Sequence, residues 1–316
     1  MLLSRVAERV YWQARYLERV ENTARLLSVY STLLLDMPRG TKLGWHTLVQ
    51  ISGTEKTFAR RYKQQSERNV IRFLLSERNG QSILDNLALT RENARTTREV
   101  MPTEAFELIN NLYYLARDQA DNAVARGPRH ELLEGLIACC QQITGLLSGS
   151  MSRDDAYSFF RLGRSLERAD MTTRIVDVGT RDLLEPVIKT DSDDSSRAPF
   201  ENILWMNVLR SQSAYQMYRQ HVRERIRGED VVRYLMQDEE FPRATAHNLT
   251  TLVKVLQKLP NSGKVKWQVD KTRRLVREGD IAKLLGKGLL RYIDELQKEL
   301  AEIHFKIADT WFLPNK

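Results

Sequence analysis

A twelve-residue segment occurs twice in this 316-residue chain, and this duplication is the strongest constraint on its fold. Residues 14–25 read ARYLERVENTAR and residues 163–174 read GRSLERADMTTR, at a constant offset of 149 residues. The matched pairs are Arg15/Arg164, Leu17/Leu166, Glu18/Glu167, Arg19/Arg168, Thr23/Thr172 and Arg25/Arg174, and Glu21/Asp170 keeps the acid. Chance is a poor explanation for such a match, so we expect a structural unit that is used twice.

Weaker matches follow in the same order along the chain. Trp45 and Phe58 correspond to Trp205 and Tyr218, NVIRFLLSE (69–77) to DVVRYLMQD (230–238), and SILDNL (82–87) to ATAHNL (244–249). These matches predict two helical repeats, residues 1–150 and residues 151–316. Because the motif helix opens both repeats, we expect the two copies to pack about a pseudo-two-fold axis and to join both halves into one core.

The composition and the apolar spacing both indicate an all-α chain. Good helix formers dominate, and 15 Gly and 8 Pro are too few for the many tight turns of a sheet protein. Apolar residues recur at three- and four-residue steps over most of the sequence. The predicted helices cover about residues 3–35, 44–64, 67–75, 80–99, 103–126, 130–150, 153–184, 199–226, 229–236, 242–258, 266–277 and 280–311. The polar segment KTDSDDSSRAP (189–199) is predicted to be a loop.

Charge and targeting patterns favour a soluble cytoplasmic protein with anionic partners. The formal net charge is +8, but the basic residues are mixed with 41 acidic ones along the helices, which disfavours nucleic-acid binding. Cys139 and Cys140 are adjacent in a helical run and cannot form an ordinary disulfide, which indicates a reducing compartment. The N-terminus carries charge too early for a signal peptide, and the run LLSVYSTLLL is too short to span a membrane.

The repeated motif places acids next to an apolar face. In a helical projection Leu3, Val6, Val10, Ala14 and Leu17 form an apolar stripe that also contains Glu21, and Asp170 takes the same place in the second copy. A buried carboxylate must be paired, hydrogen-bonded or protonated. Arg25 and Arg174 follow these acids by four residues, and we expect arginines of the facing copy to complete the pairing.

Three interpretations of the motif remain open. We favour a symmetric ion-pair network that fixes helix register, the second is a pocket for an anionic ligand or a reaction, and the third is a set of surface salt bridges. In a pocket the candidate acids or bases are Glu18, Glu21, Glu167 and Asp170, and the candidate anion-binding residues are Arg15, Arg19, Arg25, Arg164, Arg168 and Arg174. Arg95 in RENARTTRE (91–99) could add a further basic wall, although a solvated helix face is the favoured interpretation there.

Known catalytic and cofactor motifs do not occur in the sequence. The five histidines lack metal-ligand spacing, and the chain has no Gly-rich phosphate loop, nucleophile elbow or HExxH. We therefore predict no metal and no cofactor.

The two motif helices, the RENAR segment and the FPRA turn (241–244) resemble the bacterial alpha-E family, named for its helices and a recurring Glu-Arg motif. The resemblance covers essentially the whole chain and implies partners: a circularly permuted ATP-grasp protein and a transglutaminase-like protein. It implies a helical accessory or substrate-handling partner of an ATP-grasp carboxylate–amine ligase in peptide or amide-bond chemistry. The alternative is an enzyme in its own right that uses the Arg/Glu network on an anionic substrate, and whether catalysis occurs on this chain is left open.

Overall fold

The computed structural model describes residues 2–36, 44–184, 194–223, 225–286 and 288–313, and within these ranges it contains helices and no strand. This confirms the predicted all-α class. In the first half the helices are α1 (Ser4–Asp36), α2 (His46–Ser52), α3 (Glu55–Arg61), α4 (Glu67–Leu75), α5 (Ile83–Arg95), α6 (Thr103–Gln119) and α7 (Arg126–Ser150). In the second half they are α8 (Asp155–Leu184), α9 (Asp194–Ser211), α10 (Tyr215–His221), α11 (Gly228–Gln237), α12 (Thr245–Leu256), α13 (Gly263–Glu278), α14 (Ile281–Gly286) and α15 (Leu289–Ile307). Single turns at Arg98–Val100, Asn122–Val124 and Ala308–Phe312 complete the described elements.

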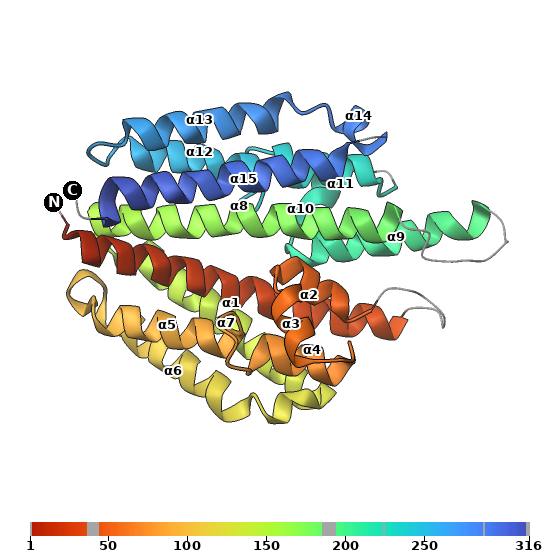
Figure 1. Cartoon of the computed structure of the whole chain (residues 1–316), viewed down its shortest axis with the longest axis horizontal. Helices are drawn as coiled ribbons and strands as arrows, with labels where there is room; N and C mark the ends of the chain where they lie inside the picture. Colours follow the sequence, from red (N-terminus) through yellow and green to blue (C-terminus); the bar gives the residue numbers. More distant parts are fainter. Residues whose placement is uncertain (1, 37–43, 185–193, 224, 287, 314–316) are drawn as a thin grey trace.

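The two motif helices, α1 and α8, lie side by side at the centre of the molecule (Figure 1). Helices α5, α6 and α7 lie on the α1 side, and α12, α13 and α15 lie on the α8 side. The first and last described residues lie at the same end. The motif helices therefore form the junction of the two halves.

A glycine at the crossing lets α1 and α8 approach closely. A Cβ placed on Gly163 would lie 2.2 Å from the carbonyl oxygen of Tyr11 and 3.3 Å from the Cβ of Ala14. Since real Cβ atoms do not come so near a backbone oxygen, any larger residue at this position would push the helices apart. In the duplication Gly163 corresponds to Ala14, so both copies place a small residue at this contact.

Buried apolar side chains from both halves form one cluster, which runs from Ala7 of α1 to Phe312 near the C-terminus. In both halves the motif helix comes first and a long helix comes last, while the described helices between them differ in number and length. The pseudo-two-fold axis between the halves, and their division at residue 150, remain predictions.

Several predicted helices are interrupted, and one predicted loop is partly wrong. The helix expected over 44–64 breaks at Gly53 (φ +67°). The helix expected over 199–226 breaks near Ser213 (φ 52°). Helix α9 begins at Asp194, so residues 194–199 are helical rather than part of a loop. The Asp and Ser residues of this segment are also common at helix N-termini, which is why polarity alone misled the prediction. Residues 189–193 of the predicted loop lie outside the described residues.

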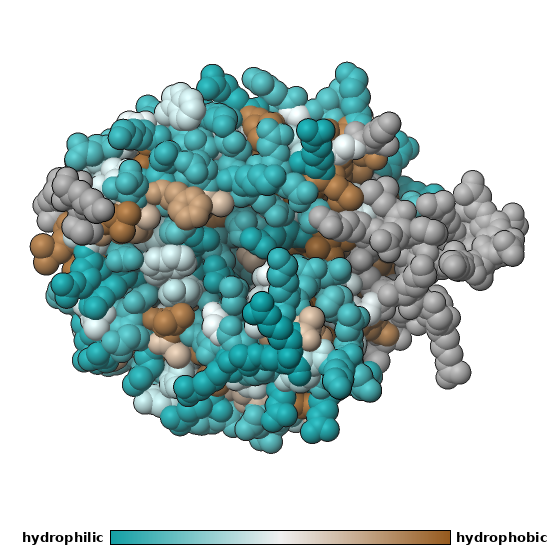
Figure 2. Space-filling view, in the orientation of Figure 1, coloured by the Kyte–Doolittle hydropathy of each residue, from teal (hydrophilic) through white to brown (hydrophobic). Residues whose placement is uncertain are grey.

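Within the described ranges one helix, α7, is long and apolar enough to cross a membrane by length and composition. Leu132, Leu136 and Ile143 of α7 are fully buried in the structure, and the helix packs on α1 and α6. One face of α7 is therefore packed against the protein, while 33% of the apolar window as a whole is buried. The face of the molecule in Figure 2 is mostly hydrophilic, with small separate hydrophobic areas.

Candidate functional site: an arginine–glutamate network beside a basic cavity

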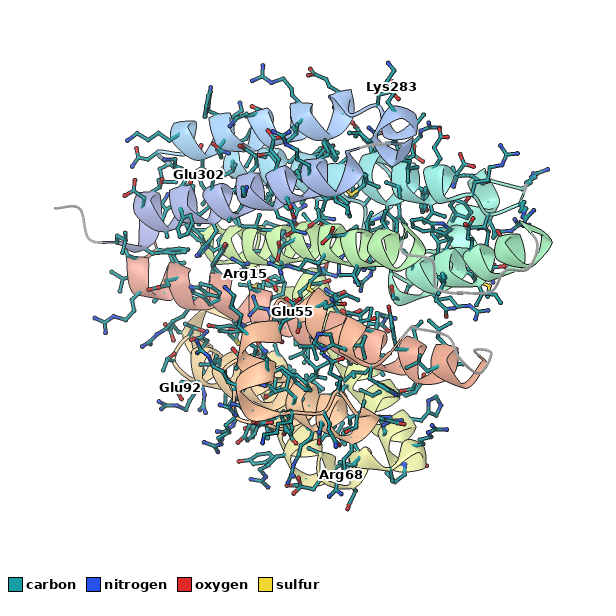
Figure 3. All side chains as sticks on the ribbon, turned by 45° about the vertical axis from the view of Figure 1, so that its right-hand side comes forward. Arg15, Glu55, Arg68, Glu92, Lys283 and Glu302 are labelled. Carbon is teal, nitrogen blue, oxygen red and sulfur yellow. The ribbon has the colours of Figure 1, made fainter. Side chains whose placement is uncertain are left out.

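Glu167 of α8 is held by two arginines of α1. Arg15 donates from Nε to Oε2 at 2.7 Å, and Arg19 donates from Nε to Oε1 at 2.6 Å and from Nη2 to Oε2 at 3.1 Å. The glutamate side chain is 1% exposed. Arg15 lies where α1 faces α8 in Figure 3, whereas Glu92 lies on the outside of the first half. The Glu167 cluster therefore crosses the junction between the two halves.

Glu18 of α1 is bound in the opposite direction by arginines of α8. Arg168 donates from Nε and Nη2 at 2.8 Å each, and Arg164 donates from Nε at 3.2 Å. Each motif glutamate thus accepts hydrogen bonds from the arginines that precede and follow its counterpart in the other copy. Planar guanidinium groups suit this two-point pairing with a carboxylate.

Glu21 has a partner that the motif does not contain. Arg25 binds it from the next helical turn at 2.8 Å, as expected from the spacing. Its second partner is Arg243, which lies in the turn before α12 and donates to it at 2.6 Å. Arg243 also donates to Asn22 at 2.7 Å and to Glu18 at 3.3 Å. The facing-copy arginines that we expected at Glu21 bind Glu18 instead.

Asp170 has a simpler environment than Glu21. Arg174 donates to it from Nε at 2.9 Å, four residues along the same helix. Its side chain is 17% exposed against 4% for Glu21. The two equivalent acids therefore differ in burial and in the number of their partners.

The cluster around Glu18 has more positive than negative groups. Its four arginines, Arg25, Arg164, Arg168 and Arg243, are hydrogen-bonded to only two carboxylates, Glu18 and Glu21. The excess of two positive charges lies in largely buried surroundings, where charges are poorly screened.

Shifted pKa values reflect this charge balance. Burial alone would raise the pKa of Glu167, but Arg19 and Arg15 outweigh it and lower the pKa to about 2. The pKa of Glu18 is also lowered, because Arg168, Arg243 and Arg164 outweigh its burial. Burial and repulsion from Arg168 lower the pKa of Arg243 to about 10. The same two causes lower the pKa of Arg164. Glu18 and Glu167 are thus ionised. For Arg164 and Arg243, the nearby carboxylates do not offset the effects of burial and of repulsion from Arg168.

A polar cavity of about 300 Å³ borders the Glu18 cluster. It lies between α7, α8 and the start of α12, and its lining is Thr144, Ser148, Tyr157, Phe160, Arg161, Arg164, Ser165, Arg168, Pro242, His247, Asn248 and Thr251. The lining contains three arginines and no carboxylate. Arg161 makes no ion pair or side-chain hydrogen bond with the described part of the chain, and Arg164 uses only Nε. Guanidinium N–H groups of Arg161 and Arg164 that make no hydrogen bond to the described residues therefore line a cavity, and its volume falls in the range of small-molecule binding sites.

At the equivalent place in the first copy of the motif, aromatic rings pack beside the arginine. Trp12 stands where the second copy has Arg161. Its ring stacks on Tyr16 at 5.3 Å, and the guanidinium carbon of Arg15 lies 5.0 Å from its centroid. Arg15 also donates to the Tyr11 hydroxyl, which is hydrogen-bonded to Nδ1 of His304 at 2.9 Å. The two copies therefore share the ion pairs but differ in the side chains that pack beside them.

Ten of the eleven candidate residues form ion pairs on the motif helices, in three groups: around Glu167, around Glu18 and Glu21, and in the pair of Asp170 and Arg174. The exception is Arg95, which is on α5 and forms an exposed pair with Glu92, as the favoured interpretation of that segment expected. Sequence reasoning missed Arg161, although Arg161, Arg164 and Arg168 are spaced to share one helix face. It also missed Arg243, which only the tertiary fold brings to α1.

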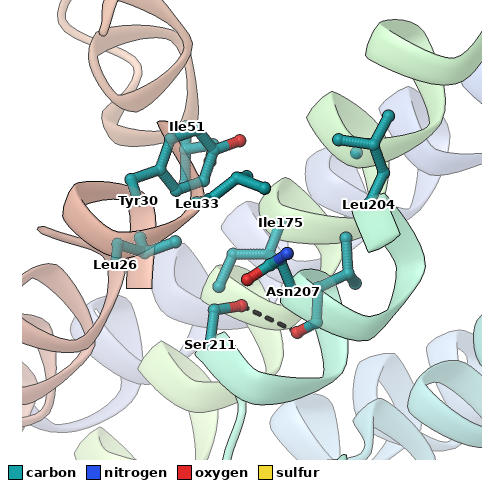
Figure 4. A pocket seen from close by; sticks show the side chains of 10 residues that line it. Leu26, Tyr30, Leu33, Ile51, Ile175, Leu204, Asn207 and Ser211 are labelled. Carbon is teal, nitrogen blue, oxygen red and sulfur yellow. Dashed lines mark hydrogen bonds between the residues drawn. The ribbon is translucent and has the colours of Figure 1, made fainter. Parts of the chain in front are cut away.

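A second cavity, shown in Figure 4, is too small for a substrate. It lies between α1, α2, α8 and α9 and is lined mainly by apolar residues such as Leu26, Ile51 and Ile175. Its volume of about 20 Å³ is room for roughly one water molecule. Asn207 and Ser211 supply polar atoms there, and Ser211 donates to the carbonyl of Val208. We therefore place the candidate site at the basic cavity.

Comparison with known proteins shows that the Glu-Arg motif is a feature of a protein family. A family model described as "a predicted alpha-helical domain with a conserved ER motif" matches residues 2–312. No curated protein and no solved structure matches the chain. The glutamate–arginine steps at Glu18–Arg19 and Glu167–Arg168 are the residues that cross-link α1 and α8. The chain, matched over nearly its whole length, belongs to the Alpha-E family.

Proposed function

We propose that this Alpha-E protein holds an anionic substrate in the cavity between α7, α8 and α12. The observation that supports this proposal is the excess positive charge of the Glu18 cluster beside an accessible, carboxylate-free cavity. An anion bound there would compensate Arg161 and Arg164, and its hydrogen bonds to charged donors would each contribute about 1.5–3 kcal/mol. Hydroxyl groups of Thr144, Ser148 and Thr251 would add neutral hydrogen bonds.

The lowered pKa values favour binding over chemistry on this chain. A general acid or base works best with a pKa near the working pH. Glu167 has a pKa of about 2, and arginines also hold the pKa of Glu18 below its ordinary value. Both carboxylates are therefore poor proton acceptors, and we assign them to holding arginines in place. This argues against the alternative of an enzyme that uses Glu18 or Glu167 as a proton acceptor.

The reaction would then take place on a partner. We propose a circularly permuted ATP-grasp carboxylate–amine ligase as that partner, with a transglutaminase-like protein as a further one, acting in peptide or amide-bond chemistry in the cytoplasm. The support is the family resemblance together with the lack of a nucleotide-binding motif in this sequence. Co-purification of the two proteins at micromolar concentration tests this part, and failure to form a complex would remove it.

Calorimetric titration with inorganic phosphate and with glutamate tests the binding site itself. We expect both anions to bind, and Arg161→Gln to weaken binding by about tenfold, the effect of one lost charged hydrogen bond. Arg161 has no partner in the described part of the chain, so the variant should keep its fold. Arg95→Gln removes the same charge from an exposed site and is the matched control. No binding by the native protein, or equal weakening in both variants, would refute the proposed function.

A further inference from the structure

A second basic cavity continues the first one along α8. It has a volume of about 300 Å³ and is lined by Arg153, Tyr157, Ser158, Arg161, Val255 and Lys258. Tyr157 and Arg161 line both cavities, so the two spaces meet at these side chains. Neither lining contains a carboxylate, and the acidic residues at the start of α8, Asp154 and Asp155, line neither space. We refer to the two adjoining cavities together as the basic groove.

The positive charges of the groove occur at separate places along its length. Arg164 and Arg168 lie at one end, Arg161 lies where the cavities join, and Arg153 and Lys258 lie at the other end. From Tyr157 to Arg168 the axis of α8 rises by roughly 17 Å. An extended peptide covers this length with about five residues. A single phosphate or carboxylate would fill only one end of the groove.

The groove wall between the charges suits a peptide better than an oligophosphate. Pro242 is exposed and offers apolar surface, and the partly exposed Tyr157 ring lies 4.1 Å from the guanidinium carbon of Arg153. Hydroxyl groups of Thr144, Ser148 and Thr251 can exchange hydrogen bonds with amide groups. Phosphate chains have no hydrocarbon for the apolar surface and no amide hydrogen for the hydroxyl oxygens.

We propose that the groove formed by both cavities binds a short acidic peptide, with one carboxylate at Arg161 and Arg164 and another at Arg153 and Lys258. This inference rests on the proposed function and extends it by naming the class of substrate. A second anchored carboxylate acts at high effective concentration and should strengthen binding without a change at the first.

Calorimetry with glutamate, pentaglutamate and tripolyphosphate tests the inference. Pentaglutamate should bind at least about tenfold more tightly than glutamate. The double variant Arg153→Ala/Lys258→Ala should lose this gain and bind glutamate as the native protein does. Arg117→Ala/Lys283→Ala removes the same two charges from exposed positions on α6 and α14 and should keep the gain.

The outcomes separate the two proposals. If glutamate binds but pentaglutamate binds no better, the peptide inference is overturned and the proposed function stands. Two results would show general attraction of polyanions and would also overturn the inference. One is that tripolyphosphate binds as much more tightly than glutamate as pentaglutamate does, and the other is that Arg117→Ala/Lys283→Ala loses the gain in pentaglutamate affinity. If no anion binds at all, both proposals fail.

Discussion

Arg168 of α8 donates two hydrogen bonds of 2.8 Å to Glu18 of α1, across 150 residues of chain. The equivalent residues in the opposite direction, Arg19 and Glu167, are also joined by two hydrogen bonds. Because each bidentate pair restricts sliding and rotation of one helix on the other, the two pairs together fix the register of α1 against α8. Arg168 also lines the basic cavity, so one of the two contacts that set the register positions the candidate site.

Removing the Glu167 carboxylate should strongly destabilise the protein. Glu167→Ala leaves Arg15 and Arg19 without their carboxylate in largely buried surroundings, and breaking such a pair costs about 3–5 kcal/mol. Glu92→Ala breaks an exposed pair with Arg95 and should cost at most about 1 kcal/mol. Urea unfolding of both variants measures the difference, and a cost below about 1 kcal/mol for Glu167→Ala would show that the network does not hold the junction.

The close helix contact gives a second stability prediction. Gly163→Ala places a Cβ 2.2 Å from the Tyr11 carbonyl oxygen, and the required shift should cost about 1–3 kcal/mol. Gly145→Ala is the matched control, because a Cβ on this helical residue of α7 would meet no atom within 4 Å. That change should stabilise the protein by up to about 1 kcal/mol through helix propensity. Equal unfolding free energies for the two variants would contradict the close approach of α1 and α8.

Acid should destabilise the protein in two pH windows. Burial and nearby Arg15 lower the pKa of His304 from 6.5 to about 4, so only the unfolded chain binds this proton between these values. Glu167 gives a second window between 4.5 and about 2. In each window the unfolded state binds more protons, so the free energy of unfolding falls as the pH falls.

The histidine window can be isolated by substitution. Unfolding of His304→Gln, measured from about pH 7 to about pH 4, should lose less stability over this range than the native protein. His221→Gln removes an exposed histidine on α10 and is the control. A native-like slope for His304→Gln would be inconsistent with a partly buried imidazole that stays neutral in the folded state.

The helices, and the contact between α1 and α8, could be predicted from the sequence. Apolar periodicity can be recognised within a short segment, and the duplication identifies two equivalent helices. The bonding pattern of the motif was less accessible. A projection that assumes one apolar stripe placed Glu21 against the facing helix, but α1 packs on α5, α7, α8 and α9 and is buried on several sides. For such a central helix one stripe does not define which side faces the partner, so the projection predicted the facing arginines at Glu21 rather than at Glu18.

Arg243 marks the limit of sequence-based prediction. It lies more than 200 residues from Glu18 and Glu21 and reaches them only because α12 packs beside α8. The cavity depends in the same way on three helices meeting, α7, α8 and α12. By contrast, the basic face of Arg161, Arg164 and Arg168 follows from helical spacing and was available in the sequence.

The charge balance at Glu18 predicts opposite effects on stability and on binding. Glu18→Gln keeps the shape of the side chain but leaves Arg164, Arg168 and Arg243 without one negative charge, so the free energy of unfolding should fall. The same change raises the positive potential at the cavity and should strengthen binding of inorganic phosphate by about tenfold. Glu92→Gln, an equal change of charge on the exposed face of α5, should alter neither quantity appreciably. Unchanged or weaker phosphate binding by a folded Glu18→Gln variant, measured by calorimetry, would mean that the arginines serve Glu18 alone and are not directed at a ligand.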